Sequence, residues 1–405
     1  MNALIMAAAA ILVAAALSGG DQLLPDVDGI SLTETTVTSS LDGTEQPVII
    51  GVPDGYRAGT PTPLLVGLHT WSGDYRQRAM AYGRQAAMRQ WLLLLPNFRG
   101  PNKAANPNGA QAGGSLLAQH DIVDARARMI ERFDVDEERI YITGDSGGGH
   151  MALLMAGKWP DLWAAAAAWV PVTDLREWWE VQNGYAADIV AMTGGEPGDS
   201  PEVDFEYARR SPRTFITNLA HLPVLLGHGD SDPTIPVEQS WRTFRQLRDL
   251  PAHNTLFHVF SGGHTGLQTF GLDWCVEHTG SAAPARELHL VTDESKSYYW
   301  ADLAVADQTR LATADVVPGE DVLSVATTNL EALTLDLSEL PPPAEGMMLA
   351  ARNDLPLRLE LAGLPSTAQM TCEGEWATVV EQSETALTLS IEQSEITRSF
   401  LLTWQ

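Results

Sequence analysis

The sequence of 405 residues is short of positive charge, of cysteine and of long hydrophobic runs. Lys and Arg number 25 against 52 Asp and Glu, which gives a formal net charge of −27. Such a charge repels phosphate groups, so we do not expect the chain to bind nucleic acid or an anionic membrane surface. A hydrophobic content of 44% nevertheless excludes a disordered chain. The length allows a large domain and a smaller one.

The sequence also lacks the usual metal and phosphate motifs. Only two cysteines occur, Cys275 and Cys372, and two distant cysteines cannot form a zinc site by themselves. No HExxH motif is present, and the glycines at 147–149 are not followed by the Lys-Ser/Thr pair of a P-loop. We therefore predict no metal and no cofactor. If the protein is exported, a Cys275–Cys372 disulfide is one interpretation, and two buried free thiols are the other.

The longest uncharged apolar run covers residues 2–17 and is too short to span a bilayer comfortably. Small residues follow at Ala16 and Ser18, as at the cleavage site of a secretory signal peptide, although no Lys or Arg precedes the run. We interpret residues 1–18 as a signal peptide and predict a secreted or periplasmic protein that is free of the membrane after cleavage. An uncleaved anchor is the alternative.

Short apolar strands alternate with helical segments over residues 47–282. Continuous apolar runs such as Pro63–His69 and Trp91–Pro96 are typical of buried parallel strands, and Leu116–Phe133 has the pattern of a long amphipathic helix. This alternation predicts an α/β fold with a doubly wound, mostly parallel sheet.

Two flanking segments have other patterns. Residues 19–46 are polar and rich in Thr, Ser and Asp, which indicates an N-terminal arm or an edge strand. Over residues 283–405 apolar and polar residues alternate between turn signals. We therefore predict a smaller, β-rich C-terminal domain, most simply a sandwich.

The segment 139–150, RIYITGDSGGGH, has the strand–turn–helix pattern of a nucleophile elbow. Such a turn strains the backbone of Ser146 and lifts its hydroxyl above the sheet, while Gly144 and Gly148 let neighbouring backbones approach. GxSxG also arises by chance, and the string GDSGG occurs in chymotrypsin-like proteases. In those proteases the serine lies in an all-β barrel and follows its His and Asp in the chain. Here a helix follows the serine, so we reject that alternative.

Two later segments supply partners for Ser146. Asp232 follows a predicted strand and precedes a Pro-Thr-Ile-Pro turn, so we choose it over Asp230, to which we assign a local role in the turn. His264 lies on a glycine-rich loop between a strand and a helix. The order Ser146, Asp232, His264 is that of α/β-hydrolases. Three other histidines lie within helices or strands or at a helix end and are poorer candidates for the base: His150, His258 and His278.

The oxyanion hole of this fold takes one amide from the loop after an early strand and one from the residue after the nucleophile. We assign these amides to Trp71 and Gly147. Because Thr70 stands where a glycine is common, Thr70 remains an alternative to Trp71. Each donor contributes on the order of 3 kcal/mol in this class of reaction.

The segments LHTWSGDY, NFRG, GDSGGGHMAL, HGDSDPTIP and GGHTG resemble the prolyl oligopeptidase family of serine hydrolases. The resemblance covers about residues 47–280. Oligopeptidases of this family carry a large N-terminal β-propeller, whereas fewer than fifty residues precede the catalytic region here. Many short relatives look like carboxylesterases, including ones that act on decorated polysaccharides. We therefore expect an ester substrate, including esters linked to a polysaccharide. Short peptides are the alternative.

Substrate contacts are expected in the aromatic region after the elbow. Trp178 and Trp179 are adjacent and cannot both face one core from a helix, so we interpret them as lid residues, with Tyr185 beside them. Arg210 is a candidate for pairing with a substrate carboxylate. Core packing is the alternative for the aromatic rings. For Arg209, Arg210 and Arg213 we favour structural ion pairs over a substrate contact, because the chain is so acidic.

A non-enzymatic interpretation is also open at this stage. The α/β-hydrolase fold can persist as an inactive scaffold, and the C-terminal β domain could bind carbohydrate or protein partners. The sequence does not predict an oligomeric state.

Overall fold

The computed structural model describes most of the chain, and the described residues are 23–107, 109–181, 184–250, 253–280, 286–340, 346–364, 376–383 and 385–403. The predicted signal peptide, residues 1–18, lies outside them, as does Cys372. Within these ranges, no helix combines the length and the apolar character that crossing a bilayer requires.

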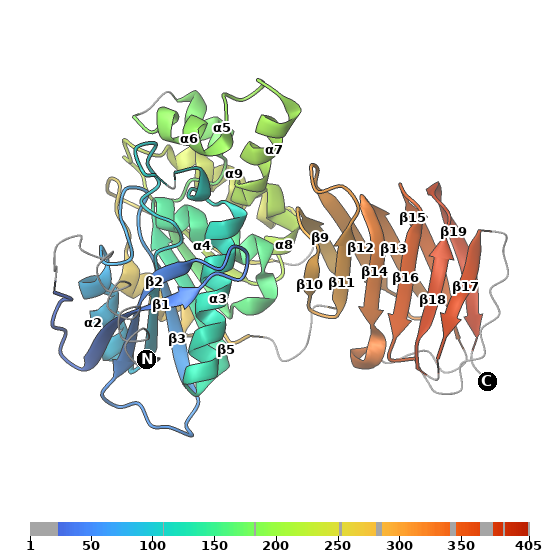
Figure 1. Ribbon diagram of the computed structural model, residues 1–405, viewed down its shortest axis with the longest axis horizontal. Coiled ribbons are helices and arrows are strands. Elements are labelled where there is room, and N and C mark those ends of the chain that lie inside the picture. Colours follow the sequence, from blue (N-terminus) through green and yellow to red (C-terminus); the bar gives the residue numbers. More distant parts are fainter. Residues whose placement is uncertain are drawn as a thin grey trace, which may run out of the picture.

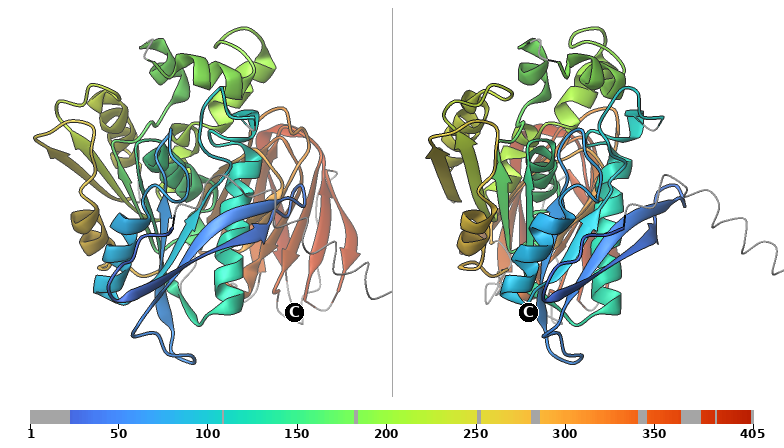
Figure 2. Two further views of the ribbon diagram at one scale, coloured as in Figure 1. Left: turned by 60° about the vertical axis from the view of Figure 1, so that its left-hand side comes forward. Right: turned by 90° about the vertical axis from the view of Figure 1, so that its left-hand side faces the viewer.

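Eight strands form the first sheet, in the order β1-β2-β4-β3-β5-β6-β7-β8 (Figure 1). Their bounds are β1 (Ile30–Thr38), β2 (Glu45–Pro53), β3 (Thr62–Leu68), β4 (Leu92–Pro96), β5 (Val135–Asp145), β6 (Ala165–Trp169), β7 (Pro223–Gly229) and β8 (Asn254–Phe260). The β1–β2 and β2–β4 pairs are antiparallel, and every pair from β4 to β8 is parallel. The prediction of a mostly parallel, doubly wound sheet is confirmed. The hairpin β1–β2 lies in the foreground of Figure 2, and β1 is an edge strand within the segment that we interpreted as an arm or edge.

Helices cover both faces of this sheet (Figure 2). On one face pack α3 (Leu116–Arg132), α4 (Gly147–Lys158) and α9 (Val237–Arg248), and on the other pack α2 (Ala79–Arg89) and α10 (Gln268–Cys275). In β3, Leu64, Val66 and Leu68 contact the first group of helices, while Leu65 contacts the second. Because both faces are covered, the strands β4 (LLLLP) and β6 (AAAAW) are apolar and buried at every position.

Four short helices lie between β6 and β7: α5 (Leu175–Glu180), α6 (Ala186–Thr193), α7 (Pro201–Arg209) and α8 (Ile216–Leu219). Figure 1 shows α5, α6 and α7 above the sheet, at the top of the molecule. Their buried residues form one cluster with Trp71, which lies on the loop after β3. The inserted helices therefore share a core with a loop of the predicted active site. The described residues also form the 3₁₀ helices η1 (Gly109–Gln111), η2 (Pro160–Leu162), η3 (Pro212–Phe215) and η4 (Leu337–Glu339).

The C-terminal strands form two further sheets, with the orders β10-β11-β14-β16-β18-β17 and β19-β15-β13-β12-β9. Most pairs are antiparallel, and β13–β15 and β14–β16 are parallel. Both sheets contribute to one buried core, so the prediction of a β-rich sandwich after the α/β part is confirmed. The bounds are β9 (Leu288–Thr292), β10 (Lys296–Tyr298), β11 (Ala301–Val305), β12 (Ala312–Pro318), β13 (Val322–Thr328), β14 (Leu330–Asp336), β15 (Gly346–Asn353), β16 (Leu357–Ala362), β17 (Ala377–Gln382), β18 (Leu387–Ile391) and β19 (Ser394–Thr403).

A buried ionic network joins the sandwich to the α/β part. Lys158 at the end of α4 lies 2.6 Å from Asp293, which follows β9, and neither side chain is exposed. Arg209 Nε donates to the other oxygen of Asp293 at 2.7 Å. Burial by itself would raise the pKa of Asp293, but the charges of Lys158 and Arg209 outweigh it and hold the pKa below its usual value. These contacts make the sandwich an integral part of the fold.

We predict that Asp293→Asn lowers the free energy of unfolding by about 3–5 kcal/mol, because Lys158 loses its buried counter-charge. The measurement is a urea unfolding curve followed by tryptophan fluorescence. The matched control is Asp315→Asn, since Asp315 pairs with His289 at the exposed surface of the same sandwich. Equal unfolding midpoints for the two variants would show that the buried network contributes nothing special.

Candidate active site

Ser146 sits at the sharp turn between β5 and α4, with φ 57° and ψ −119°. A positive φ is unfavourable for a residue with a side chain and is held here by the surrounding structure. The Ser146 amide donates to the Trp169 carbonyl at 2.8 Å, and α4 behind it is buried at every residue. A Cβ atom at Gly144 would lie 2.4 Å from the Gly148 carbonyl carbon, so the turn requires glycine there. The segment has the geometry of a nucleophile elbow.

His264 and Asp232 form the hydrogen-bonded pair that the chain order predicts. His264 Nδ1 lies 2.7 Å from Asp232 Oδ2, and the second oxygen of Asp232 accepts the amides of Thr234 and Ile235 at 2.8 and 3.0 Å. Since a carboxylate can only accept, Nδ1 carries the proton and Nε2 remains free to act as the base. Ser146 and His264 line the same pocket, which has a volume of about 180 Å³.

Asp232 is fully buried and stays ionised through its hydrogen bonds. Burial by itself would raise its pKa, but donors from His228, His264, Ile235 and Thr234 outweigh burial and hold the pKa well below the usual range. His228 Nε2 lies 3.4 Å from Asp232 Oδ2, and His228 Nδ1 bonds to the Ser240 hydroxyl at 2.8 Å. His228 was not among the residues expected at the site, although its spacing of four residues from Asp232 is visible in the sequence.

Asp230 has the local role that we expected for it. Its side chain accepts the Ser231 hydroxyl at 2.9 Å and the Gly262 amide at 3.1 Å, and it does not contact His264. It therefore ties the loop after β7 to the loop that carries the histidine.

One hydrogen bond distinguishes between Thr70 and Trp71 as the second amide of the oxyanion hole. The Thr70 amide donates to the Gln77 side chain at 3.0 Å, so it is already occupied. In the described part of the chain the Trp71 amide has no acceptor. A Cβ atom at Gly147 would lie only 2.4 Å from the Trp71 nitrogen, which shows how closely these two backbones approach. The geometry therefore favours Gly147 and Trp71 over Thr70.

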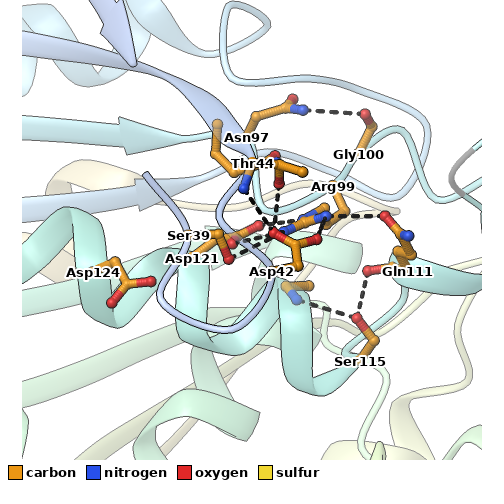
Figure 3. Close-up of polar contacts among 12 residues, drawn as sticks. Ser39, Asp42, Thr44, Asn97, Arg99, Gly100, Gln111, Ser115, Asp121 and Asp124 are labelled. Atoms are coloured by element: carbon orange, nitrogen blue, oxygen red, sulfur yellow. Dashed lines mark hydrogen bonds and ion pairs between the residues drawn. The ribbon is translucent and has the colours of Figure 1, made fainter. Parts of the chain in front are cut away.

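The loop of the NFRG segment supports the Trp71 loop from behind. The ring of His69 stacks on Phe98 at 3.9 Å and 7°, and His69 Nε2 contacts the Asn97 carbonyl at 2.7 Å. Next in sequence, the buried Arg99 binds Asp121 of α3 at 2.6 Å and Asp42 of the β1–β2 turn at 2.9 Å (Figure 3). Figure 3 shows Gln111 on the same guanidinium group. An N-terminal hairpin, α3 and the loop after β4 thus fix the position of the oxyanion loop.

The predicted substrate contacts divide into one that lines the pocket and three that do not. Tyr185 lines it, together with Trp71, Arg78 and Asp145. The lid interpretation of Trp178 and Trp179 is not supported, because Trp178 is 1% exposed and packs on Trp71 at 4.9 Å, while Trp179 packs against the same cluster. The short helix α5 buries the ring of Trp178 fully and that of Trp179 in part, and neither ring lines the pocket.

Arg210 is a structural residue, contrary to its assignment as a substrate contact. Its guanidinium pairs with Glu206 at 2.6 Å and donates to the Ala112 carbonyl at 3.0 Å, and the residue is 6% exposed. The neighbouring cations are paired in the same way, Arg209 with Asp293 and Arg213 with Asp174 and Glu177. A buried cation must be neutralised within the fold, which explains these pairs.

Cys275 of α10 is a free and fully buried thiol, and burial raises its pKa strongly. Its predicted disulfide partner, Cys372, lies outside the described residues. Among the residues that the structure describes, no group of three or more His, Cys, Asp or Glu side chains is arranged to hold a metal.

Comparison with known proteins covers the part of the chain that contains these residues. Residues 116–273, which include Ser146, Asp232 and His264, match the family model described as the prolyl oligopeptidase family. The hydrolase part of this chain is therefore similar to that family. The resemblance seen in the sequence motifs is thereby confirmed for the α/β part, and the matches do not extend to the sandwich.

The proteins to which this chain is similar carry names of both peptidases and esterases. The Uncharacterized peptidase YtmA of Bacillus subtilis is 28% identical over 179 residues, which span 44% of this chain and 66% of that protein. Feruloyl esterase C of Emericella nidulans is 25% identical over 237 residues, or 58% of this chain and 81% of that protein. The solved structure of an acetyl xylan esterase from Paenibacillus sp. R4 has the same fold, with a TM-score of 0.51 at 20% identity, over 63% of this chain and 86% of that one.

The fully buried His150, one turn after Ser146, makes stability sensitive to acid. Burial lowers its pKa to about 4, and its Nε2 contacts the Arg210 carbonyl at 2.7 Å. In the unfolded chain a histidine titrates near 6.5, so the unfolded state binds more protons between these two values. The stabilisation is complete above about pH 6.5 and is lost as the pH falls toward 4.

We predict that His150→Gln, which keeps a donor for the Arg210 carbonyl, reduces the loss of unfolding free energy between pH 6.5 and 4.5 by about 2 kcal/mol. Urea unfolding at the two pH values measures this difference, with His289→Gln on the exposed surface as the control. If His150→Gln and the wild type lose the same free energy, His150 is not the acid-sensitive group.

Proposed function

We propose that this protein is a secreted serine hydrolase that cleaves carboxylic esters through an acyl-enzyme. The observation that carries the proposal is one small pocket that is lined by the strained Ser146, by His264 and by Trp71, with Asp232 hydrogen-bonded to His264. The match of residues 116–273 to the prolyl oligopeptidase family model supports the same chemistry.

In the proposed mechanism, Ser146 Oγ attacks the ester carbonyl while His264 Nε2 accepts the hydroxyl proton. Asp232 holds the imidazole through Nδ1 and stabilises the imidazolium that forms. The amides of Gly147 and Trp71 bind the oxyanion, each contributing on the order of 3 kcal/mol. His264 then gives its proton to the departing alkoxide. Water repeats the sequence on the acyl-enzyme and releases the carboxylic acid and the free serine.

One observation favours a small acyl group, and another favours an ester over a peptide. The pocket of about 180 Å³ is smaller than the several hundred Å³ that hold drug-sized ligands, so it suits a small acyl group. The chain also spans 81% of feruloyl esterase C, against 66% of the Bacillus relative named as a peptidase. Cleavage of short peptides is the second candidate, and the name of that Bacillus relative supports it.

An activity panel on the wild type, Ser146→Ala and Ser72→Ala tests the proposal. The panel holds short p-nitrophenyl esters, acetylated and feruloylated xylan, and prolyl and alanyl peptide amides. We expect ester cleavage that falls about 10⁴-fold in Ser146→Ala and stays within a few-fold of wild type in Ser72→Ala, since Ser72 lies in the same pocket without a predicted role as nucleophile.

Other outcomes of the panel have definite meanings. Amide cleavage that depends on Ser146, with the esters silent, would establish the peptidase alternative. Near-normal ester turnover in Ser146→Ala would refute the mechanism. A folded wild type that is silent on every substrate would reject hydrolysis and favour a binding function.

Export is part of the proposal and rests on the apolar run over residues 2–17 and the small residues Ala16 and Ser18. We expect the full-length chain, expressed in a host that secretes proteins, to be recovered outside the cytoplasm with residue 19 at its N-terminus. Mass spectrometry of the intact protein measures this. Recovery of the uncleaved chain in the membrane fraction would establish an anchor instead.

A further inference from the structure

Asp145, directly before the nucleophile, is a second buried carboxylate at the wall of the active-site pocket. The residue is 2% exposed and lines the pocket together with Ser146 and His264. None of the mechanistic steps above uses it. A buried carboxylate beside reacting groups requires an explanation, because its charge is costly unless it is paired.

The contacts of Asp145 join three segments of the chain. Its Oδ2 forms an ion pair with Arg78 Nη2 at 2.6 Å, at the N-terminal end of α2, and accepts a hydrogen bond from Gln268 Nε2, the first residue of α10, at 2.7 Å. Its Oδ1 is buried and has no hydrogen-bond partner in the described part of the chain. A Cβ atom at Gly266 would lie 2.0 Å from this Oδ1, so the loop that carries His264 is packed directly on the carboxylate.

The charges around the His264 imidazole come from three elements. Asp232 on the loop after β7 binds Nδ1. Asp145 at the end of β5 interacts electrostatically with His264, and Arg78 beside α2 neutralises Asp145. Tyr82 of α2 also faces Asp145, and Tyr185 lies on the pocket wall. Burial raises the pKa of Asp145, whereas Arg78, Gln268 and His264 act in the opposite direction.

We propose that Asp145 is a positioning residue for His264. Asp145 packs the 261–267 loop onto the nucleophile strand β5, and its negative charge balances the positive charge of Arg78 beside the imidazole. The inference rests on the proposed function only in that His264 is taken as the general base. Asp145 favours the imidazolium that forms during acylation, and Arg78 limits that preference.

This pairing predicts opposite effects for the two partners. Asp145→Asn keeps the shape of the side chain but leaves the Arg78 cation uncompensated beside His264, which disfavours the imidazolium. Arg78→Met leaves the Asp145 carboxylate uncompensated, which favours the imidazolium. The double variant removes both charges and should return close to wild type. A residue that merely supported the loop would not give shifts of opposite sign.

The test is the titration of the His264 ring protons by NMR, with the signal assigned by its loss in His264→Gln. We expect the midpoint to fall by about half a pH unit in Asp145→Asn and to rise by a similar amount in Arg78→Met. In parallel, kcat of Asp145→Asn on an ester should fall about tenfold with KM within twofold of wild type, since only the proton-transfer step is affected. Asp230→Asn is the control, because Asp230 is an exposed acid that also contacts the histidine loop.

An unchanged midpoint in both single variants, or shifts of the same sign, would overturn the proposal and leave Asp145 as a structural residue. If Asp145→Asn does not fold, Arg78→Met decides by itself, since Arg78 is partly exposed at the pocket and an unchanged midpoint there contradicts the pairing. The NMR titration does not depend on turnover. Absence of hydrolysis would therefore count against the proposed function without obscuring this result.

Discussion

The strained backbone of Ser146 is the constraint on which the arrangement of this molecule depends. A positive φ at a residue with a side chain persists only where the surroundings fix it. Here the Trp169 carbonyl holds the Ser146 amide, and a helix buried on every side follows at once. The two glycines after the serine allow the close approach: Cβ atoms at Gly147 and Gly148 would collide with the backbone at the end of β3 and in the loop that follows it. The turn that carries the nucleophile and the oxyanion loop are thus closely packed, backbone against backbone.

Support for that loop extends far from the catalytic residues. His69 stacks on Phe98, and Arg99 anchors the same segment to α3 and to the N-terminal hairpin. On the other side, Trp71 is packed under the helices inserted between β6 and β7. The amide that we assign to the oxyanion hole is therefore set by three separate parts of the chain. Such rigidity is what electrostatic stabilisation of an oxyanion requires, because donors that are already in place need no reorganisation during the reaction.

The few cations of this acidic chain are largely used within the fold. Lys158 and Arg99 lie in buried networks with carboxylates, and Arg209, Arg210 and Arg213 form ion pairs around the inserted helices. Charges buried in this way are costly to leave unpaired. Of the residues that line the active-site pocket, Arg78 alone is a Lys or Arg, and it is paired with Asp145. The network at Asp293 also joins the sandwich to the α/β part, which makes a structural role of the sandwich the natural expectation.

The sequence by itself determined the order of strands and helices, the elbow at Ser146 and the choice of Asp232 and His264, because these depend on local patterns. Apolar runs identify strands covered on both faces, and a glycine turn between a strand and a helix is a local signal. The tertiary structure alone decided which amide the Trp71 loop offers, since that depends on the Gln77 side chain seven residues away from Thr70. It likewise decided that Trp178 and Arg210 belong to the interior. Whether a ring or a cation faces a substrate or a core depends on what packs above it, and the partners of Trp178 and Arg210 come from distant segments: Trp71, Thr234 and Ala112.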